Sequence, residues 1–332
     1  MTTRRLGKNG PEISAIGYGA MSFSDFYGAT SETESHAILD HCRDVGLTHL
    51  DTSNIYGMGR SEEVIGSYFA AHPDAKQEFV IATKASIARD ESGNRIFRND
   101  RKHLEEELDK SLQRMGVDHV GLFYVHRRDP NVPIEEVTES LAAIVKTGKA
   151  LGFGYSEIAP SSLRRAAKVA HVSAVQSEYS LSTRSPELGL VQACAELGTA
   201  LVAFSPVGRS LLTDTPLSFE AVQSLDFLRG NPRFMRPNYE ANVRAAAGFC
   251  ALAAEMGVSA AGLANAWLLA QGDHVIPIPG TRSVSHLSDC LQGRDLVLTG
   301  EDLARIEMVL PLGWAHGDRY SDAQWIGPER YC

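Results

Sequence analysis

The sequence alternates between two kinds of segment, and this alternation constrains its fold more than any other feature. Short runs rich in β-branched and other apolar residues are each followed by a longer segment with helical periodicity. Because an intervening helix returns the chain to the same end of a sheet, the strands should be parallel. The eight strand-like runs are Ile13–Gly17, Thr48–Thr52, Phe79–Thr83, His119–His126, Ala150–Gly154, Ala174–Ser177, Ala200–Phe204 and His274–Ile278.

Two architectures fit such an alternation: a doubly wound open sheet and a closed (β/α)8 TIM barrel. A dinucleotide-binding open sheet would carry a GxGxxG fingerprint after its first strand, but Gly17–Ser22 reads GYGAMS and lacks that spacing. The count of eight runs and the missing fingerprint favour the barrel. We therefore expect one α/β domain over residues 1–332, a barrel with its active site at the carboxyl ends of the strands.

Signals for helix ends fall between the strand-like runs. Ser31 and Glu34 match a capping box, and Pro133 suits a first helical turn. Gly116 and Gly148 stand where helices should stop.

Two segments interrupt the alternation. Residues 205–237 form a long loop after the seventh run and are rich in proline and glycine, and residues 313–332 form an irregular tail. Loops this long in a compact domain usually bind or cover a ligand. We expect the first of them to lie at the active site.

The composition limits the class of protein. With 32 Lys and Arg against 41 Asp and Glu, the formal net charge is −9, which disfavours non-specific binding to nucleic acid or anionic membranes. The amino terminus shows no apolar signal region, and no apolar stretch reaches the ~20 residues of a membrane span. The five cysteines are scattered, odd in number and without CxxC metal spacing. We expect a cytoplasmic protein with reduced thiols and no bound metal.

Four polar side chains follow three consecutive strand-like runs. Asp51 and Tyr56 come at and after the end of the second run, Lys84 follows the third, and His126 ends the fourth. Each of them alone would more often be structural. Because the carboxyl ends of barrel strands meet at one face, we expect all four to line one pocket.

Together these side chains suit proton transfer. A tyrosine with a pKa near ~10 is a weak acid at neutral pH, and a nearby lysine ammonium lowers that pKa by stabilising the phenolate. An aspartate keeps the lysine charged and oriented, and a neutral histidine donates a hydrogen bond to a substrate oxygen. The set can protonate an oxygen that becomes an alkoxide, as the reduction of a carbonyl requires.

The sequence resembles the aldo-keto reductase family over essentially its whole length. The resemblance is densest in Leu50–Ser67 and continues through Thr83–Lys84, Tyr124–Arg127, Gly154–Glu157, Gln176–Leu181, Phe204–Gly208 and Ile278–Arg282. It implies a barrel that binds NADPH without a Rossmann domain. It also implies that Tyr56 is the general acid, that Lys84 and Asp51 tune it, and that His126 orients the carbonyl.

The resemblance further implies the residues that hold NADPH. They should contact the carboxamide, stack on the nicotinamide, follow the pyrophosphate and hold the adenosine phosphate. Glu157 stands where the wider family usually has Asn and resembles a bacterial and plant-type subgroup. Arg282 favours NADPH over NADH, although dual use stays open. The expected contacts are Gly19, Ala20, Met21, Asp51, Ser156, Glu157, Gln176, Phe204, Ser205, Pro206, Val207, Gly208, Ser210, Gly280, Thr281, Arg282, His286, Asp289 and Cys290.

The substrate pocket is expected from the loops around these residues. It should be formed by Met21, Phe26, Tyr27, Tyr56, His126 and Arg127. The aromatic and Met side chains would make an apolar wall, or would only anchor their loop. Arg127 forms a salt bridge across the rim or binds an anionic substrate.

The tail leaves a similar choice open. Its aromatic residues Trp314, Tyr320 and Trp325 either close the pocket or pack on the exterior of the barrel.

The leading interpretation is an NADPH-dependent reductase that acts on a small aldehyde or ketone as a monomer or small homo-oligomer. One alternative enzyme is a lyase that forms a Schiff base on Lys84, but Tyr56 would have no role in it. A second alternative is a nicotinamide-nucleotide-binding sensor or regulatory subunit with slow turnover. The physiological substrate and the preferred direction stay open.

Overall fold

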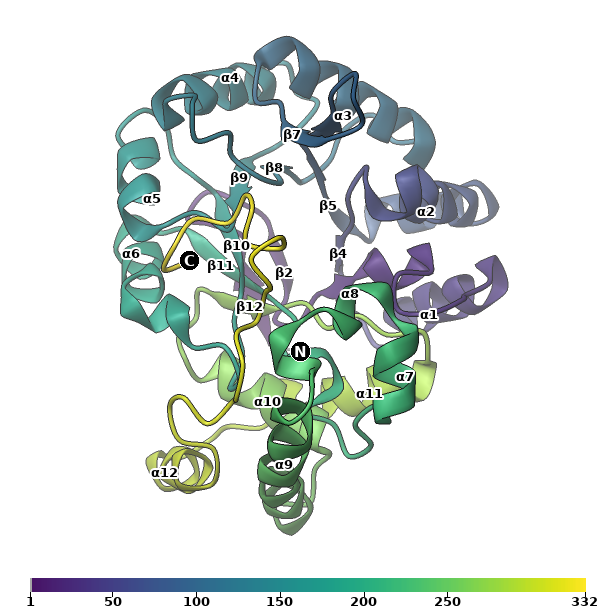
Figure 1. Ribbon diagram of the computed structural model, residues 1–332. Coiled ribbons are helices and arrows are strands. Elements are labelled where there is room, and N and C mark those ends of the chain that lie inside the picture. Colours follow the sequence, from purple (N-terminus) through teal and green to yellow (C-terminus); the bar gives the residue numbers. More distant parts are fainter. Residues whose placement is uncertain (1) are drawn as a thin grey trace.

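The computed structural model, which describes residues 2–332, contains a parallel sheet of eight strands in the order β12-β11-β10-β9-β8-β5-β4-β3. Backbone hydrogen bonds from Gly17 to Pro277 (2.9 Å) and from Gly19 to Pro279 (3.0 Å) join the two outer strands. These bonds close the sheet into the expected (β/α)8 barrel (Figure 1). Its strands are β3 (Tyr18–Gly19), β4 (His49–Asp51), β5 (Val80–Ala85), β8 (Leu122–Val125), β9 (Phe153–Ser156), β10 (Ala174–Glu178), β11 (Ala200–Phe204) and β12 (Val275–Pro277).

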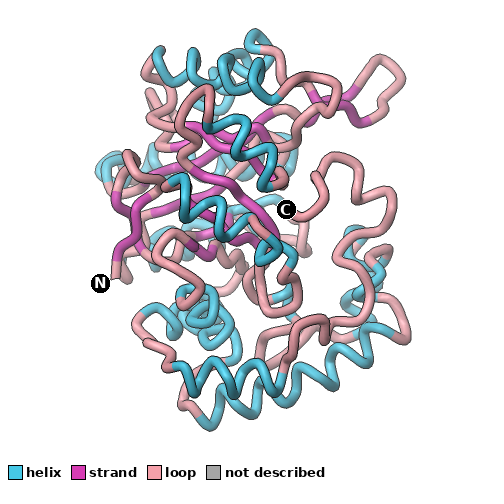
Figure 2. The backbone as a smooth tube through the Cα atoms, turned by 90° about the vertical axis from the view of Figure 1, so that its left-hand side faces the viewer, coloured by secondary structure: helices cyan, strands magenta, loops and turns pink. Residues whose placement is uncertain are grey.

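Helices surround the strands on the outside of the barrel (Figures 1 and 2). Those between consecutive strands are α1 (Glu32–Asp44), α2 (Arg60–Ala71), α3 (Arg101–Met115), α4 (Ile134–Lys146), α5 (Pro160–Ala167) and α6 (Leu190–Leu197). The last part of the chain adds α9 (Asn238–Glu255), α10 (Ala260–Leu269), α11 (Val284–Leu291) and α12 (Gly300–Val309).

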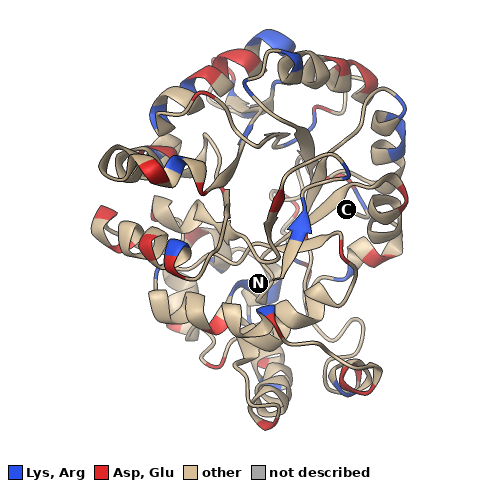
Figure 3. Cartoon of the chain, turned by 180° about the vertical axis from the view of Figure 1, so that it is seen from behind, with Lys and Arg blue, Asp and Glu red and all other residues tan. Residues whose placement is uncertain are grey.

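The first strand-like run was placed wrongly. The first two residues of that run, Ile13 and Ser14, belong to β2 (Glu12–Ser14), which pairs antiparallel with β1 (Thr3–Arg5), and the barrel begins only at β3. This hairpin covers the amino-terminal end of the barrel, where Figure 3 shows the N-terminus near the centre. Leu6 and Ile13 pack against the side chains inside the barrel. The run is apolar because the hairpin covers the amino-terminal end of the core inside the barrel.

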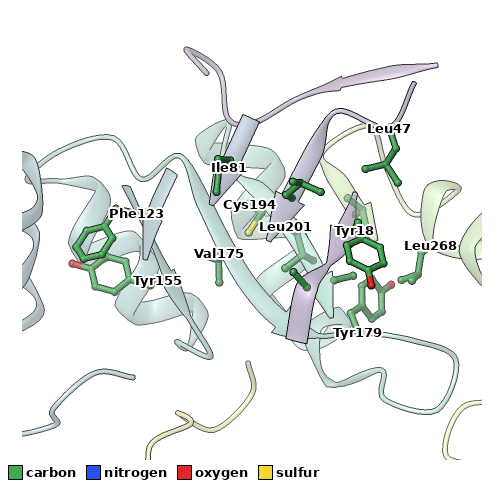
Figure 4. Packing of buried hydrophobic residues seen from close by; sticks show 14 of the residues in the cluster. Tyr18, Leu47, Ile81, Phe123, Tyr155, Val175, Tyr179, Cys194, Leu201 and Leu268 are labelled. Atoms are coloured by element: carbon green, nitrogen blue, oxygen red, sulfur yellow. The ribbon is translucent and has the colours of Figure 1, made fainter. Parts of the chain in front are cut away.

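Alternate residues of each strand face two separate cores. On β8, Leu122 and Tyr124 belong to the cluster inside the barrel, whereas Phe123 and Val125 belong to the larger cluster between strands and helices. Figure 4 shows part of that larger cluster, with Phe123 beside Tyr155. The inner core ends below the carboxyl face, where polar side chains replace apolar ones.

The helix-end signals are confirmed in the structure. Ser31 and Glu34 form a capping box at the start of α1, and Pro133 immediately precedes α4. Gly116 ends α3 with φ 63°, and Gly148 follows α4 with φ 81°; glycine adopts such left-handed angles without strain.

The long loop after β11 contains short helices, α7 (Phe219–Ser224) and α8 (Asp226–Arg229), around a small apolar cluster of its own. The tail after α12 is irregular and crosses the carboxyl face of the barrel, as the yellow segment in Figure 1 shows. Both segments therefore lie over the face where the active site is expected.

Within residues 2–332, no single helix is long and apolar enough to cross a membrane. Helices α9 and α10 meet the length and composition criteria only as a pair, and they are bent by 86° relative to each other.

Gly154 lies where a side chain cannot fit. A Cβ atom there would be 2.4 Å from the carbonyl oxygen of Ala174 and 2.6 Å from the ring of Tyr124. We predict that Gly154→Ala lowers the free energy of unfolding by about 1–3 kcal/mol, because overpacking a core displaces its neighbours. Urea denaturation of the purified variant measures this.

Gly300→Ala is the matched control, because its Cβ would meet no atom within 4 Å. It should leave stability unchanged or raise it by up to ~1 kcal/mol. Equal stability of the two variants would contradict the packing described for β9.

Candidate active site

The structure brings Asp51, Tyr56, Lys84 and His126 together at the carboxyl face of the barrel. The Lys84 ammonium forms an ion pair with Asp51 and donates hydrogen bonds to the Thr52 carbonyl (2.7 Å) and the Tyr56 hydroxyl (3.3 Å). The rings of Tyr56 and His126 lie edge to face with centroids 6.0 Å apart. A single lysine thus joins the carboxylate to the phenol, and the imidazole stands beside the phenol.

A sharp turn after β4 places Tyr56 in this cluster. Gly57, Met58 and Gly59 all have left-handed backbone angles, with φ of 60°, 56° and 104°. A Cβ on Gly57 would be 3.0 Å from the side chain of Ser24, so this position has little room for a larger residue. The turn directs the chain straight into α2 and leaves Tyr56 partly exposed at the mouth of the barrel.

Helix α2 is in turn fixed to the strand that carries Lys84. The buried carboxylate of Glu62 accepts hydrogen bonds from Thr83 Oγ1 (2.5 Å) and Arg114 Nε (2.7 Å). Because Thr83 directly precedes Lys84, this contact fixes the position of Lys84 relative to α2, the helix that follows Tyr56.

Burial and neighbouring charges set the proton affinities. Burial alone would lower the pKa of Lys84, but Asp51 and Tyr56 more than offset it, so the pKa is raised and the lysine stays charged. Burial raises the pKa of Tyr56 more than Lys84 lowers it, so the net direction is upward, opposite to the simple expectation from the lysine alone. Burial lowers the pKa of His126 well below its usual value, and Arg127 and Lys84 lower it further. At neutral pH the site therefore holds a protonated phenol and a neutral imidazole.

Two further residues support the four, and sequence reasoning gave neither of them this role. Ser53 Oγ lies 3.1 Å from His126 Nδ1, and Gln176 Nε2 donates to Asp51 Oδ2 at 2.7 Å. Ser53 lies inside the Asp51–Tyr56 segment, and this position was the one sequence signal for its role beside His126. Gln176 was expected at the carboxamide, and its contact with Asp51 depends on strand register.

Glu157 pairs with the tail. Its carboxylate, fully buried, is held by both terminal nitrogens of Arg319 at 3.0 and 2.8 Å and by the backbone N–H of Glu178 at 2.9 Å. Burial alone would raise the pKa of Glu157, but the charges of Arg319 and Arg127 and the hydrogen bonds from Arg319 and the Glu178 backbone together keep that pKa below the ordinary value. Arg209, from the long loop, pairs with Glu178 at 2.6 Å. Buried ion pairs thus join the tail and the loop to the barrel.

The rim of the site is closed by aromatic contacts between three loops. Phe26 packs on Phe227 of the long loop with ring centroids 5.1 Å apart, Phe227 lies 6.3 Å from Tyr320, and Tyr320 lies 5.5 Å from Trp325. Tyr27 contacts Phe26 at 5.0 Å. Tyr320 and Trp325 therefore belong to the rim.

Trp314 behaves differently. It is buried in the outer core and donates its indole N–H to the Leu181 carbonyl at 2.8 Å.

The expected nicotinamide contacts lie on neighbouring strands. Ser156 ends β9, Gln176 lies in β10, and Phe204 ends β11 with its side chain partly exposed. The Ser156 hydroxyl accepts a hydrogen bond from Arg127 and keeps its own proton free to donate, which suits a primary amide. The carboxylate of Glu157 is already bound by Arg319, so in this geometry it fits the carboxamide less well.

The segment after Phe204 suits an anion. Ser205, Gly208, Arg209 and Ser210 have positive φ values of 52°, 59°, 55° and 84°. Such backbone turns direct successive N–H groups to one side, as in phosphate-binding loops. Pro206 and Val207 complete this segment, and its geometry fits a pyrophosphate.

The other expected cofactor residues are scattered around the first and last strands. Gly19 ends β3, Ala20 is buried, and Met21 is partly exposed beside them. Gly280 and Thr281 lead from β12 toward α11, where Arg282 is exposed and donates to the Ala29 carbonyl at 2.7 Å. His286 is exposed, Asp289 is partly exposed, and Cys290 is buried with only 5% of its surface accessible. Of these last three, Cys290 has the least surface available to an adenine.

The Glu157–Arg319 pair generates a stability prediction. Because the pKa of Glu157 is lowered in the folded state, the pair stabilises the protein above the ordinary carboxyl pKa and loses this contribution as the pH falls. We predict that Glu157→Gln costs about 3–5 kcal/mol near neutral pH, since it leaves a buried guanidinium without its partner. Denaturant unfolding at a series of pH values should show the difference from the unmodified protein shrinking in acid.

Glu135→Gln is the control, since Glu135 pairs with Arg165 where both side chains are exposed. Its cost should be much smaller than that of Glu157→Gln, because exposed ion pairs are screened by solvent. An equally small, pH-independent cost for Glu157→Gln would contradict the description of the buried pair.

Comparison with known proteins agrees with this geometry. Residues 15–311 match the model of the aldo/keto reductase family. A relative from Schizosaccharomyces pombe is named aldo-keto reductase yakc, and its name includes the cofactor NADP(+). It is 38% identical to this chain over 291 residues, which cover 86% of this chain and 85% of that protein.

Two solved structures share the fold. A glycerol dehydrogenase from Gluconobacter oxydans superposes with a TM-score of 0.80 at 25% identity over 93% of this chain and 94% of its own. The holo form of an aldo-keto reductase from Bacillus halodurans gives a TM-score of 0.76 at 23% identity over 98% and 99%. The resemblance seen in the sequence is confirmed: the chain belongs to the aldo/keto reductase family, a family of NADP-linked oxidoreductases that act on carbonyl and alcohol groups.

Proposed function

We propose that this protein reduces an aldehyde or ketone to an alcohol with NADPH and that Tyr56 donates the proton. The observation that carries the proposal is the contact between the buried Lys84 ammonium and the Tyr56 hydroxyl, with Asp51 on the other side of the lysine. NADPH, when bound, supplies the hydride to the carbonyl carbon. The residues of the chain must then orient the carbonyl and deliver one proton to its oxygen.

Tyr56 is protonated at neutral pH because its pKa is raised, and its hydroxyl stands at the mouth of the barrel. As negative charge develops on the substrate oxygen, the phenolic proton moves to that oxygen and a phenolate remains. The Lys84 ammonium stabilises this phenolate from 3.3 Å inside a site that excludes much of the water.

His126 is proposed to orient the carbonyl. In the tautomer in which Nδ1 accepts from the Ser53 hydroxyl, the ring proton lies on Nε2, and we propose that this tautomer donates it to the substrate oxygen. Because burial keeps the imidazole neutral, His126 positions the oxygen and Tyr56 supplies the proton.

The cofactor proposal rests on the loop and helix ends described above. Ser156 and Gln176 would hold the carboxamide, Phe204 would lie against the nicotinamide, and residues 205–210 would follow the pyrophosphate. Arg282 would select the 2′-phosphate of NADPH. The name of the Schizosaccharomyces pombe relative, with NADP(+), supports this choice. We propose a cytoplasmic location, where reduced NADP favours carbonyl reduction.

Tyr56→Phe tests the acid directly. Loss of the phenolic proton should lower kcat for a small aldehyde by about 10²–10⁴-fold, the usual contribution of a general acid, while NADPH binding is retained. The decrease in NADPH absorbance measures turnover, and nucleotide fluorescence measures binding. Tyr331→Phe is the matched control, because that tyrosine is 64% exposed. This variant should reduce the aldehyde at the rate of the unmodified protein.

Two results would contradict the proposal. Turnover by Tyr56→Phe at the original rate would exclude Tyr56 as the acid. NADPH binding without turnover of any aldehyde, ketone or alcohol would favour the sensor interpretation.

The pKa directions also predict the pH profile. Because the pKa of His126 is well below its usual value and that of Tyr56 is raised, neither group titrates between about pH 6 and 9. With NADPH saturating, kcat for reduction should therefore be nearly constant over this range. A loss of activity centred near the ordinary histidine pKa would show that His126 titrates and would contradict the neutral imidazole.

A further inference from the structure

Among the described residues, Arg127 has no anionic partner, although it directly follows His126. Its Nη1 atom donates to the His126 carbonyl (2.7 Å) and to Ser156 Oγ (3.0 Å), and no carboxylate of residues 2–332 lies within 4.0 Å of its guanidinium. Its Nε and Nη2 atoms form no hydrogen bond and are not sealed from solvent. An arginine offers five N–H donors in a fixed fork, so most of this fork is free for a ligand.

Three neighbouring arginines of this face are already paired with carboxylates. Arg128 pairs with Glu329 at 2.5 Å, Arg209 pairs with Glu178, and Arg319 holds Glu157 in the buried pair described above. The charge of Arg127 also lowers the pKa of Glu157, but the Glu157 carboxylate already forms a salt bridge with Arg319. Within the described chain, therefore, Arg127 adds positive charge that the protein itself does not balance.

Two more unpaired cations extend this charge outward. Arg89 and Arg95 lie on the hairpin of β6 (Ile87–Arg89) and β7 (Arg95–Phe97), which follows the strand of Lys84. The Arg95 guanidinium lies 5.9 Å from the centre of the Phe97 ring, and Phe97 and Arg127 both lie against Gly327 of the tail, so Arg95 is close to Arg127. Burial and the charges of Arg127 and Arg89 lower the pKa of Arg95. Arg89 and Arg95 donate only to backbone carbonyls of their own turn and of the tail. We refer to Arg89, Arg95 and Arg127 together as the basic rim; Asp90 and Glu91 at the tip of the hairpin form no salt bridge with them within the described residues.

This basic rim lies apart from the expected pyrophosphate loop. Arg127 follows β8 and reaches β9, whereas residues 205–210 follow β11, two strands beyond β9 in the sheet. Gly327 of the tail lies against the aliphatic part of Arg127, since a Cβ there would be 3.0 Å from Arg127 Cδ. The phosphates of NADPH are therefore not the natural partner of Arg127.

From these contacts we propose that Arg127 is a specificity-determining residue that binds an anionic group of the carbonyl substrate. The substrate class is an aldehyde or ketone that carries a carboxylate or a phosphate, with Arg95 and Arg89 attracting it to the rim. The proposal rests on the reductase function proposed above, and it deepens the choice left open for Arg127 in the sequence.

The test compares substrates that differ only in the charged group. One pair is 4-carboxybenzaldehyde and its neutral methyl ester, and a second is glyceraldehyde 3-phosphate and glyceraldehyde. Arg127→Met should lower the ratio of kcat/KM for the preferred charged member to kcat/KM for its neutral counterpart by about tenfold or more, mainly through KM of the charged member. Whichever pair responds distinguishes a carboxylate from a phosphate.

Arg164→Gln is the control for a simple change in net charge. Arg164 lies on α5 with an exposed partner, Glu196, and its loss should alter no substrate ratio. Equal losses for charged and neutral substrates in Arg127→Met, or a raised KM for NADPH alone, would overturn the proposal. If the unmodified protein reduces neutral aldehydes or ketones but neither charged substrate, the proposal for Arg127 fails while the reductase function stands; failure with every carbonyl and alcohol tested overturns the reductase function instead.

A measurement on the unmodified protein covers the case in which Arg127→Met does not fold. With NADPH saturating, kcat/KM for 4-carboxybenzaldehyde and glyceraldehyde 3-phosphate is measured as salt is raised, with the methyl ester and glyceraldehyde as references. Attraction of an anion to a basic rim should weaken with salt only for the charged substrates. Parallel curves within both pairs would overturn the proposal.

Discussion

The active site depends on keeping one lysine charged in the interior of a barrel. Lys84 is fully buried, and Asp51 is 2% exposed, so removing both from water carries a desolvation penalty of several kcal/mol per ion. The structure offsets this penalty with further contacts: Lys84 donates to Thr52 and Tyr56, and Gln176 donates to Asp51. Three strands supply these groups, so the ion pair is satisfied only when the barrel is correctly assembled.

The same constraint explains why burial works for catalysis rather than against it. Burial raises the pKa of Tyr56 and lowers that of His126, which gives a protonated acid beside a neutral hydrogen-bond donor. In the proposed mechanism, the lysine acts mainly after proton transfer, when the phenolate would otherwise be an unpaired buried charge.

The tail and the long loop complete the site from outside the barrel. Glu157 binds Arg319 and Glu178 binds Arg209, so two acidic residues after or within neighbouring strands anchor two segments that have no place in the sheet. The aromatic contacts among Phe26, Phe227 and Tyr320 then close the rim. With these charges balanced internally, Arg127 remains as the free cation beside His126.

The sequence was informative where the signal is local or repeated. Periodicity located seven of the eight barrel strands, and their ends located Asp51, Lys84 and His126. The first strand was misplaced because an apolar run that plugs the barrel has the same pattern as one that forms its wall.

The contacts that were not predicted depend on distance in space. Arg319 is 162 residues away from Glu157, and no spacing rule joins them. The upward shift in the pKa of Tyr56 also followed from burial, which the sequence did not show.

The most direct test of the account is the pH dependence of single-turnover carbonyl reduction in Lys84→Met, with NADPH bound before mixing. If Lys84 stabilises the phenolate of Tyr56, the rate should fall by about 10²-fold or more, because the proton donor has become a weaker acid. Nucleotide binding should survive, and any alkaline loss of activity should move to higher pH than in the unmodified protein. A Lys84→Met variant that keeps the original rate and the original pH profile would contradict the central role given to the buried lysine.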